Sequence, residues 1–187
     1  MTTPRYSKRA RAIRRPYDKQ GLISEMKYIG LYGLKSKHEL RVVDKMFHDI
    51  KRRAKDILID PSEEKQITYG RSLLSRLEKQ GIIQDIDYTS KKEIIAQVEK
   101  VLDMKIEEIL DRRLQTKVFT LGLAKSIHDA RVMIGHKHIA VNGAIVDKPG
   151  FLVMAKSDGH IEISPNSTLM RNRPGRTLKK KKGTADE

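Results

Sequence analysis

Residues 110–146 read LDRRLQTKVFTLGLAKSIHDARVMIGHKHIAVNGAIV, and their pattern decides the fold of the C-terminal half. The first apolar residues recur every three or four positions, which predicts the buried face of a short helix. These residues are Leu110, Leu114, Val118 and Leu121. Gly122 favours the end of that helix, and Ser126 with Asp129 is a capping signal for a second one. The stretch therefore predicts two short helices joined by a tight turn.

A β-hairpin is expected directly after the second helix. Residues 138–146 place Asn142-Gly143 between two apolar segments, and this dipeptide favours a two-residue turn because both residues accept positive φ. Two further strands are expected at 151–153 and 160–163. The helix pair packed on this short antiparallel sheet predicts an α+β domain at residues 104–170.

A long helix is predicted upstream of this domain. Ser36 and Glu39 form a capping box, in which each side chain accepts a hydrogen bond from the other residue's backbone N–H. The apolar residues that follow step by three and four positions, as on the buried face of a helix. They are Leu40, Val43, Phe47, Ile50, Ala54 and Ile57. We expect this face to pack in a core rather than to bind a ligand.

Two more helices are expected in the same region. One starts with Pro61 at its first position, where proline is tolerated, and ends at Gly81. The other starts at a second capping box, formed by Ser90 and Glu93. Their expected core residues are Leu73, Leu74, Leu77, Ile94, Val98, Val101 and Leu102. Residues 21–103 are therefore predicted to form a helical domain.

The positive charge of the chain is concentrated at its two ends. The 187 residues include 39 Lys and Arg against 24 Asp and Glu, a net charge of +15. Residues 1–20 and 171–187 lack apolar periodicity, so we expect basic disordered arms that bind a polyanion such as RNA. A solubilising or nuclear-import role is the alternative. The RNA-binding candidates of the first arm are Arg5, Lys8, Arg9, Arg11, Arg14 and Arg15.

Several function classes lack the residues that they require. The absence of Cys excludes disulfides, thiolate metal sites and Cys nucleophiles. No apolar run approaches the roughly 18 residues of a membrane span, and the basic residues do not form one amphipathic membrane-surface helix. The sequence also contains no Gly-rich phosphate loop and no nucleophile elbow. We therefore expect a protein that is not an enzyme and uses neither a cofactor nor a small-molecule substrate.

The C-terminal pattern resembles a known RNA-binding module. The motifs that carry the resemblance lie at fixed spacing at residues 110–119, 122–126, 130–131, 134, 136–139 and 141–143. They resemble the S-four (alpha-L) RNA-binding domain, which is named after small-subunit ribosomal protein four. Residues 32–40, YGLKSKHEL, resemble the archaeal and eukaryotic branch of that ribosomal protein family. The basic N-terminal arm and the helices through residue 81 resemble that branch as well.

The resemblance implies a helical domain packed beside the S-four domain, with both bound to small-subunit ribosomal RNA. It implies a structural constituent of the cytoplasmic ribosome that binds a multi-helix RNA junction, nucleates assembly and contributes to decoding accuracy. It also implies neighbours in the messenger RNA entry region and other small-subunit proteins, such as protein five. The implied RNA contacts are Arg112, Arg113, Lys117, Lys125, Ser126, Arg131, His136, His138 and Asn142. The alternative is a free-standing S-four protein that binds RNA or rescues stalled ribosomes.

Some of these residues also have simpler interpretations. Arg113 and Lys117 lie four residues apart and are expected to project together, either toward RNA or, with Arg112, as a solvated helix face. Asn142 can contact RNA or serve the turn alone. Lys125 lies beside the exposed N–H groups at the start of the second helix, which favours a phosphate there.

The two histidines near the hairpin raise the question of a metal. His136 and His138 alternate along the chain, but no third ligand lies at a plausible spacing, so no metal site is expected. Lys137 between them stands where many relatives have Gly. A Gly accepts positive φ, so Lys137 leaves the backbone geometry at this position open and adds a cation to the candidate RNA contacts.

Overall fold

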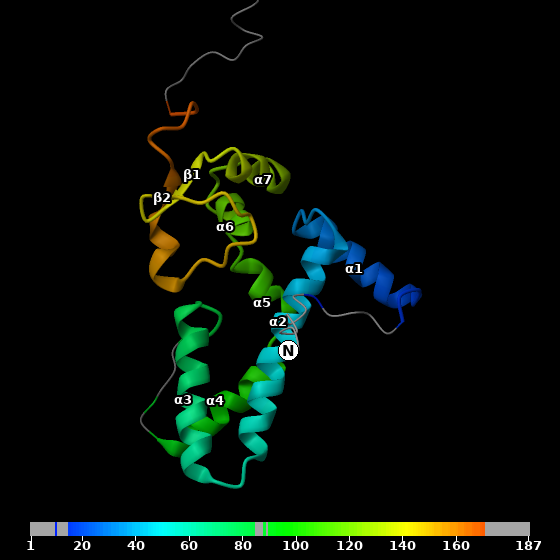
Figure 1. Cartoon of the computed structure of the whole chain (residues 1–187), viewed down its shortest axis with the longest axis vertical. Coiled ribbons are helices and arrows are strands. Elements are labelled where there is room, and N and C mark those ends of the chain that lie inside the picture. Colours follow the sequence, from blue (N-terminus) through cyan, green and yellow to red (C-terminus); the bar gives the residue numbers. More distant parts are fainter. Residues whose placement is uncertain (1–9, 11–14, 85–87, 89, 171–187) are drawn as a thin grey trace, which may run out of the picture.

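The computed structural model describes residues 10, 15–84, 88 and 90–170. Most of the predicted basic arms lie outside the described residues, so their predicted disorder and RNA binding stay predictions. This holds for residues 171–187 and for Arg5, Lys8, Arg9, Arg11 and Arg14. Figure 1 shows a helical lobe and a mixed lobe, joined by a short helix. The predicted α+β fold is therefore confirmed.

The helical lobe is built from the apolar faces that the sequence predicts. Its helices are α1 (Lys19–Leu31), α2 (Lys37–Ile59), α3 (Glu63–Lys79), α4 (Lys91–Asp103) and the short connecting α5 (Ile106–Asp111). Helices α2, α3 and α4 pack side by side, and α5 lies against α2 (Figure 1). The residues buried between them include Leu40, Val43, Ile50, Ala54, Leu73, Leu74, Leu77, Ile94, Val98 and Val101. Helix α1 packs on α2 and contributes no fully buried residue.

Helices α2 and α4 begin at the predicted residues, but only one of the two predicted capping boxes is formed. The capping box of Ser90 and Glu93 is formed. Helix α2 begins after Ser36 as predicted, but the Ser36 side chain makes no capping hydrogen bond. The Glu39 carboxylate is bonded instead to two arginines of the other lobe. The predicted box at α2 is therefore wrong, because two charged partners hold the Glu39 carboxylate.

The turn before α3 also differs from the prediction. Pro61 is not the first helical residue, because Ser62 is the N-cap and α3 begins at Glu63. The Asp60 carboxylate accepts hydrogen bonds from the backbone N–H and the hydroxyl of Ser62, at 3.1 and 3.0 Å. Asp60 thereby holds the turn into α3. The predicted end of that helix is confirmed, since Gly81 has φ +68° and follows its last turn.

The mixed lobe contains the helix pair and the sheet. Its elements are α6 (Leu114–Thr120), α7 (Ile127–Gly135), β1 (Ile139–Val141), β2 (Ala144–Ile145), the 3₁₀ helix η1 (Ala155–His160) and β3 (Ile161–Ile163). The sheet has the antiparallel order β2-β1-β3, with Ala140 opposite Ile145 and Glu162. Asn142 and Gly143 adopt φ values of +52° and +78°, which confirms the predicted hairpin turn.

The predicted helix over residues 110–121 is broken in its middle. Arg113 is extended and forms an isolated bridge with Leu152, and the Leu114 N–H donates to the Phe151 carbonyl at 2.7 Å. Leu110 therefore lies in the core of the helical lobe, whereas Leu114 begins the core of the mixed lobe. Leu121, which the periodicity placed on the buried face, is 50% exposed.

Two further details near the sheet differ from the sequence prediction. The strand expected at 151–153 is reduced to the single bridge at Leu152. Residues 155–160 form η1, and the last predicted strand is present as β3. Lys137 adopts φ +63°, so the left-handed geometry left open by the sequence is present without a glycine. The tight connection from α7 to β1 explains this, because the Lys137 and His138 N–H groups donate to the Ile134 and Met133 carbonyls.

Candidate nucleic-acid interface

The candidate RNA-binding residues of the mixed lobe separate into two groups by exposure. One group lies at the break between α5 and α6 and on the inner side of α7, where its side chains are buried or half-buried. It contains Arg112, Arg113, Lys117 and Arg131. The other lies at the two ends of α7 and at the hairpin turn, where most of its residues are exposed. It contains Lys125, Ser126, His136, Lys137, His138 and Asn142, of which only His138 is half-buried.

Arg112 is held inside the molecule by a carboxylate and a carbonyl. Its guanidinium donates to both Asp158 carboxylate oxygens, at 2.7 and 3.0 Å, and to the Val153 carbonyl at 2.7 Å. The Lys117 ammonium lies 3.4 Å from the same Asp158 carboxylate. Gly81 leaves room for this arrangement, because a Cβ atom there would lie 2.7 Å from the Arg112 guanidinium carbon. This cluster joins the end of α3 to η1 through Arg112.

A second cluster joins the two lobes around Glu39 of α2. The Arg113 guanidinium lies 3.0 Å from one Glu39 carboxylate oxygen, and Arg131 of α7 donates to both oxygens. Arg131 also donates to the side-chain oxygen of Gln115 at 3.2 Å. The predicted common projection of Arg113 and Lys117 is therefore wrong, since Arg113 points to Glu39 and Lys117 to Asp158.

Burial and pairing both affect the protonation of this cluster. Burial raises the pKa of Glu39, but the hydrogen bond and charge of Arg131 and the charge of Arg113 outweigh it, so the pKa is lowered from its ordinary 4.5. Burial lowers the pKa of Arg113, and Glu39 acts in the opposite direction. The chemistry of the cluster is that of an internal ion pair, in which both arginines compensate the half-buried Glu39 carboxylate.

Residues just before α2 add hydrogen bonds beside this cluster. The side-chain amide of Gln115, which is fully buried, donates to the Gly33 carbonyl at 3.0 Å. The Tyr32 hydroxyl donates to the Asp111 carboxylate at 2.9 Å, and burial together with this bond raises the pKa of Tyr32. Gly33 has φ +56° and approaches Gln115 closely, so a side chain would not fit there.

The start of α7 is capped by its own side chains. The Ser126 hydroxyl accepts from the Asp129 N–H at 3.1 Å, and the Asp129 carboxylate accepts from the Lys125 N–H at 3.3 Å. The predicted capping signal is thus confirmed. The Asp129 N–H thus has an acceptor within the chain, and the Lys125 ammonium, whose residue is exposed, is available to a phosphate at this end of α7.

The far end of α7 carries the two histidines. Their rings lie edge to face with centroids 6.0 Å apart, and His138 Nδ1 lies 2.8 Å from the hydroxyl of the buried Ser167. No group of three or more potential metal ligands occurs among the residues that the structure describes. The Asn142 side chain donates to the Ser157 hydroxyl at 3.0 Å, which ties the hairpin turn to η1.

Sequence reasoning missed the acidic partners of these cations. The spacing of Ser36 and Glu39 predicts a cap, and Asp158 falls between the strands expected at 151–153 and 160–163. Their arginine partners lie 74 and 92 residues from Glu39 and 46 residues from Asp158, so local spacing carries no signal of the pairs.

In the described part of the chain, no helix combines the length and the apolar character needed to cross a membrane.

Comparison with protein families identifies the module at the centre of this site. A family model described as S4 domain matches residues 112–156. The match starts at Arg112, directly after α5, and ends within η1, so it covers α6, α7, β1 and β2. This is the same S-four module that the motifs at residues 110–143 resemble. The chain therefore contains an S4 domain, and this domain makes it an RNA-binding protein.

Proposed function

We propose that this S4-domain protein is a structural constituent of the small ribosomal subunit. It binds small-subunit ribosomal RNA directly at a multi-helix junction, helps to nucleate assembly of the subunit and contributes to translational accuracy. Its neighbours are other small-subunit proteins, among them protein five, and the messenger RNA entry region. It acts in the cytoplasm within the ribosome, without catalysing a reaction.

The junction between the lobes is the observation that carries this proposal. Residues 32–40, which resemble the archaeal and eukaryotic branch of the ribosomal family, supply its contacts from the helical side. The Gly33 carbonyl accepts from Gln115, and Glu39 pairs with Arg113 and Arg131. An S4 domain built to act alone does not require these contacts. They support a single two-lobed unit that presents both lobes to one RNA.

The exposed cations of the S4 lobe are the proposed phosphate contacts. Lys125 and Lys137 lie at opposite ends of α7, and His136 adds a neighbouring donor. Each phosphate that they neutralise releases condensed counterions, which favours binding and makes it salt-dependent. Contacts to phosphates position the protein, and the shape of the folded RNA then selects the junction. Arg112 and Arg113 are left out of this face because internal carboxylates hold them.

Sedimentation of a cell extract on a sucrose gradient tests the proposal. The chain is detected by blotting, in low salt and after a high-salt wash. We expect it in the small-subunit fraction under both conditions, because a structural ribosomal protein is held by many phosphates and by packing. A chain that stays at the top of the gradient, or leaves the subunit in mild salt, contradicts the proposal and identifies a free-standing accessory S4 protein.

A further inference from the structure

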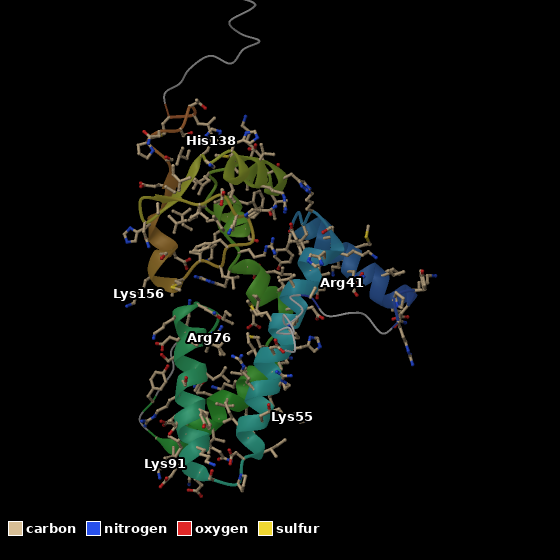
Figure 2. All side chains as sticks on the ribbon, in the orientation of Figure 1. Arg41, Lys55, Arg76, Lys91, His138 and Lys156 are labelled. Carbon is tan, nitrogen blue, oxygen red and sulfur yellow. The ribbon has the colours of Figure 1, made fainter. Side chains whose placement is uncertain are left out.

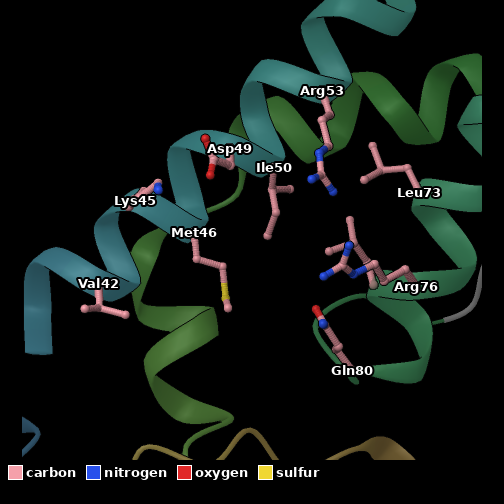
Figure 3. A pocket seen from close by; sticks show the side chains of 10 residues that line it. Val42, Lys45, Met46, Asp49, Ile50, Arg53, Leu73, Arg76 and Gln80 are labelled. Carbon is pink, nitrogen blue, oxygen red and sulfur yellow. The ribbon is translucent and has the colours of Figure 1, made fainter. Parts of the chain in front are cut away.

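A hollow between α2 and α3 lies outside the S4 domain and has the chemistry of a nucleotide site. Its volume is about 290 Å³. The floor is apolar and is made of Met46, Ile50, Leu73 and Leu77. Figure 3 shows Arg53 from α2 and Arg76 from α3 extending over this floor toward the same space, with Gln80 at one end.

Arg53 and Arg76 differ from the arginines at the lobe junction because no carboxylate of the described residues binds their guanidinium groups. Within the part of the chain that the structure describes, the side chain of neither Arg53 nor Arg76 has a hydrogen-bond or ion-pair partner, and both residues are exposed. Asp49 is the acid among the described residues that line the hollow, and it lies 3.6 Å from Arg52. The hollow therefore presents uncompensated guanidinium groups beside an apolar surface.

This combination fits one unstacked nucleotide of an RNA. A guanidinium is planar and donates in a fixed fork, so it can stack on a base and also bind a phosphate with two hydrogen bonds. The apolar floor accepts the face of a base, and the Gln80 amide can donate to or accept from its edge. Surface lysines would supply charge alone. The presence of two arginines, an amide and a floor therefore favours a nucleotide over a continuous duplex backbone.

The position of the hollow agrees with this reading. Arg76 lies toward the end of α3 that contacts η1 of the S4 lobe, where Figure 2 labels it across the junction from Lys156. Arg76 and Gln80, at one end of the hollow, therefore lie on the side of the helical lobe that contacts the S4 lobe. We propose that the hollow between α2 and α3 binds one unpaired nucleotide of the RNA held by the S4 lobe. This inference rests on the RNA-binding function proposed above.

The experiment compares two RNA probes with the full-length chain. One is a fluorescein-labelled RNA duplex with a single unpaired adenosine, and the other is the same duplex fully paired. Affinity is measured by fluorescence anisotropy. We expect the wild-type chain to bind the bulged RNA roughly fivefold more tightly, the lower end of the range for a base stacked on an aromatic side chain, because the hollow offers arginine planes instead.

Matched variants assign this preference to the hollow. Arg53→Ala with Arg76→Ala should bring the ratio of the two affinities close to one, and Arg53→Lys with Arg76→Lys should do so as well, because lysine restores charge without a stacking plane. Lys55→Ala with Lys79→Ala removes the same charge from exposed positions on the same helices. This control should weaken both complexes equally and keep the ratio.

The outcomes separate this inference from the proposed function. A wild-type chain that binds both RNAs equally overturns the nucleotide site. An unchanged ratio of the two affinities in the Arg53→Ala, Arg76→Ala variant also overturns it, and leaves an acidic protein segment as the occupant of the hollow. A ratio lost equally in the Lys55→Ala, Lys79→Ala control also overturns it. Binding of neither RNA contradicts RNA binding itself. Thermal melting of each variant should match that of the wild type, since all four side chains are exposed.

Discussion

The two lobes hold their arginines in opposite environments. At the base of the S4 lobe, Arg112 and Arg113 are 6% and 4% exposed and are bound to Asp158 and Glu39. On the helical lobe, Arg53 and Arg76 are exposed, and their side chains lack a partner within the described residues. A basic residue inside an RNA-binding motif is therefore not necessarily an RNA contact. The position of the nearest carboxylate decides whether the cation holds the fold together or meets a phosphate.

The largest expected effect comes from removing the carboxylate at the centre of the junction. Glu39→Ala leaves the buried Arg113 guanidinium without a compensating charge, which should lower the free energy of unfolding by about 3 kcal/mol. Urea denaturation measures this loss. The control is Glu64→Ala in the first turn of α3, an exposed acid without an ion pair within the described chain, which should lower stability by at most about 1 kcal/mol. Equal, small effects of both variants would show that Arg113 does not depend on Glu39.

Gly81 offers a second way to disturb the paired arginines. Gly81→Ala places a Cβ atom 2.7 Å from the Arg112 guanidinium carbon and requires φ +68° of a residue with a side chain. The left-handed backbone alone costs roughly 1–2 kcal/mol, and displacing Arg112 from Asp158 adds to it. Gly30→Ala is the matched control, because nothing lies within 4 Å of its Cβ position on α1. This control should raise stability by about 0.5–1 kcal/mol. Equal melting temperatures of the two variants would contradict the predicted constraint at Gly81.

Lowering the pH should weaken the junction, because it protonates the Glu39 carboxylate. Its pKa is lower in the folded chain than in the unfolded chain, so the carboxylate stabilises the fold fully above its ordinary pKa of 4.5. This contribution is lost as the pH falls through the lowered value. The melting temperature of the wild type should therefore exceed that of Glu39→Gln at neutral pH, and the difference should shrink between about pH 5 and pH 3. A difference that stays constant over this range would show that the charge of Glu39 does not stabilise the junction.

The smallest expected effect concerns Lys137, where two substitutions separate the contribution of backbone strain to stability from the contribution of the charge to RNA affinity. Lys137 adopts φ +63°, a conformation that costs a lysine about 1 kcal/mol relative to glycine. Lys137→Gly should therefore raise the melting temperature, whereas Lys137→Ala should leave it unchanged. Both variants remove the same cation and should lose the same RNA affinity. Different affinities of the two variants would show that the backbone at this position, rather than the ammonium, contacts the RNA.

Local patterns predicted those parts of the fold that local chemistry determines. The apolar stripe of α2, the helix end at Gly81, the capping of α7 by Ser126 and the Asn142-Gly143 turn each depend on residues a few positions apart. These elements could be predicted because side-chain spacing and backbone preferences suffice to form them.

Two of the errors share one physical cause, which is long-range pairing. The helix over residues 110–121 is broken because Leu114 donates to Phe151, and the capping box at α2 is lost because Glu39 binds Arg113 and Arg131. None of these partners is near in sequence. The sequence therefore named the candidate cations, and their contacts with RNA stay predictions. Their division into paired and open cations required the tertiary structure.

The salt dependence of RNA affinity tests most directly whether the open cations, rather than the paired ones, bind the RNA. The affinity of the full-length wild type and of the Lys125→Ala, Lys137→Ala variant for small-subunit ribosomal RNA is measured across a range of salt concentrations. Melting temperatures are recorded in the same buffer. We predict that the slope of log affinity against log salt becomes shallower by roughly 1.4–1.8, the value for two lost phosphate contacts, while the melting temperature is unchanged. An unchanged slope would contradict the account, because these exposed lysines would then not meet phosphates.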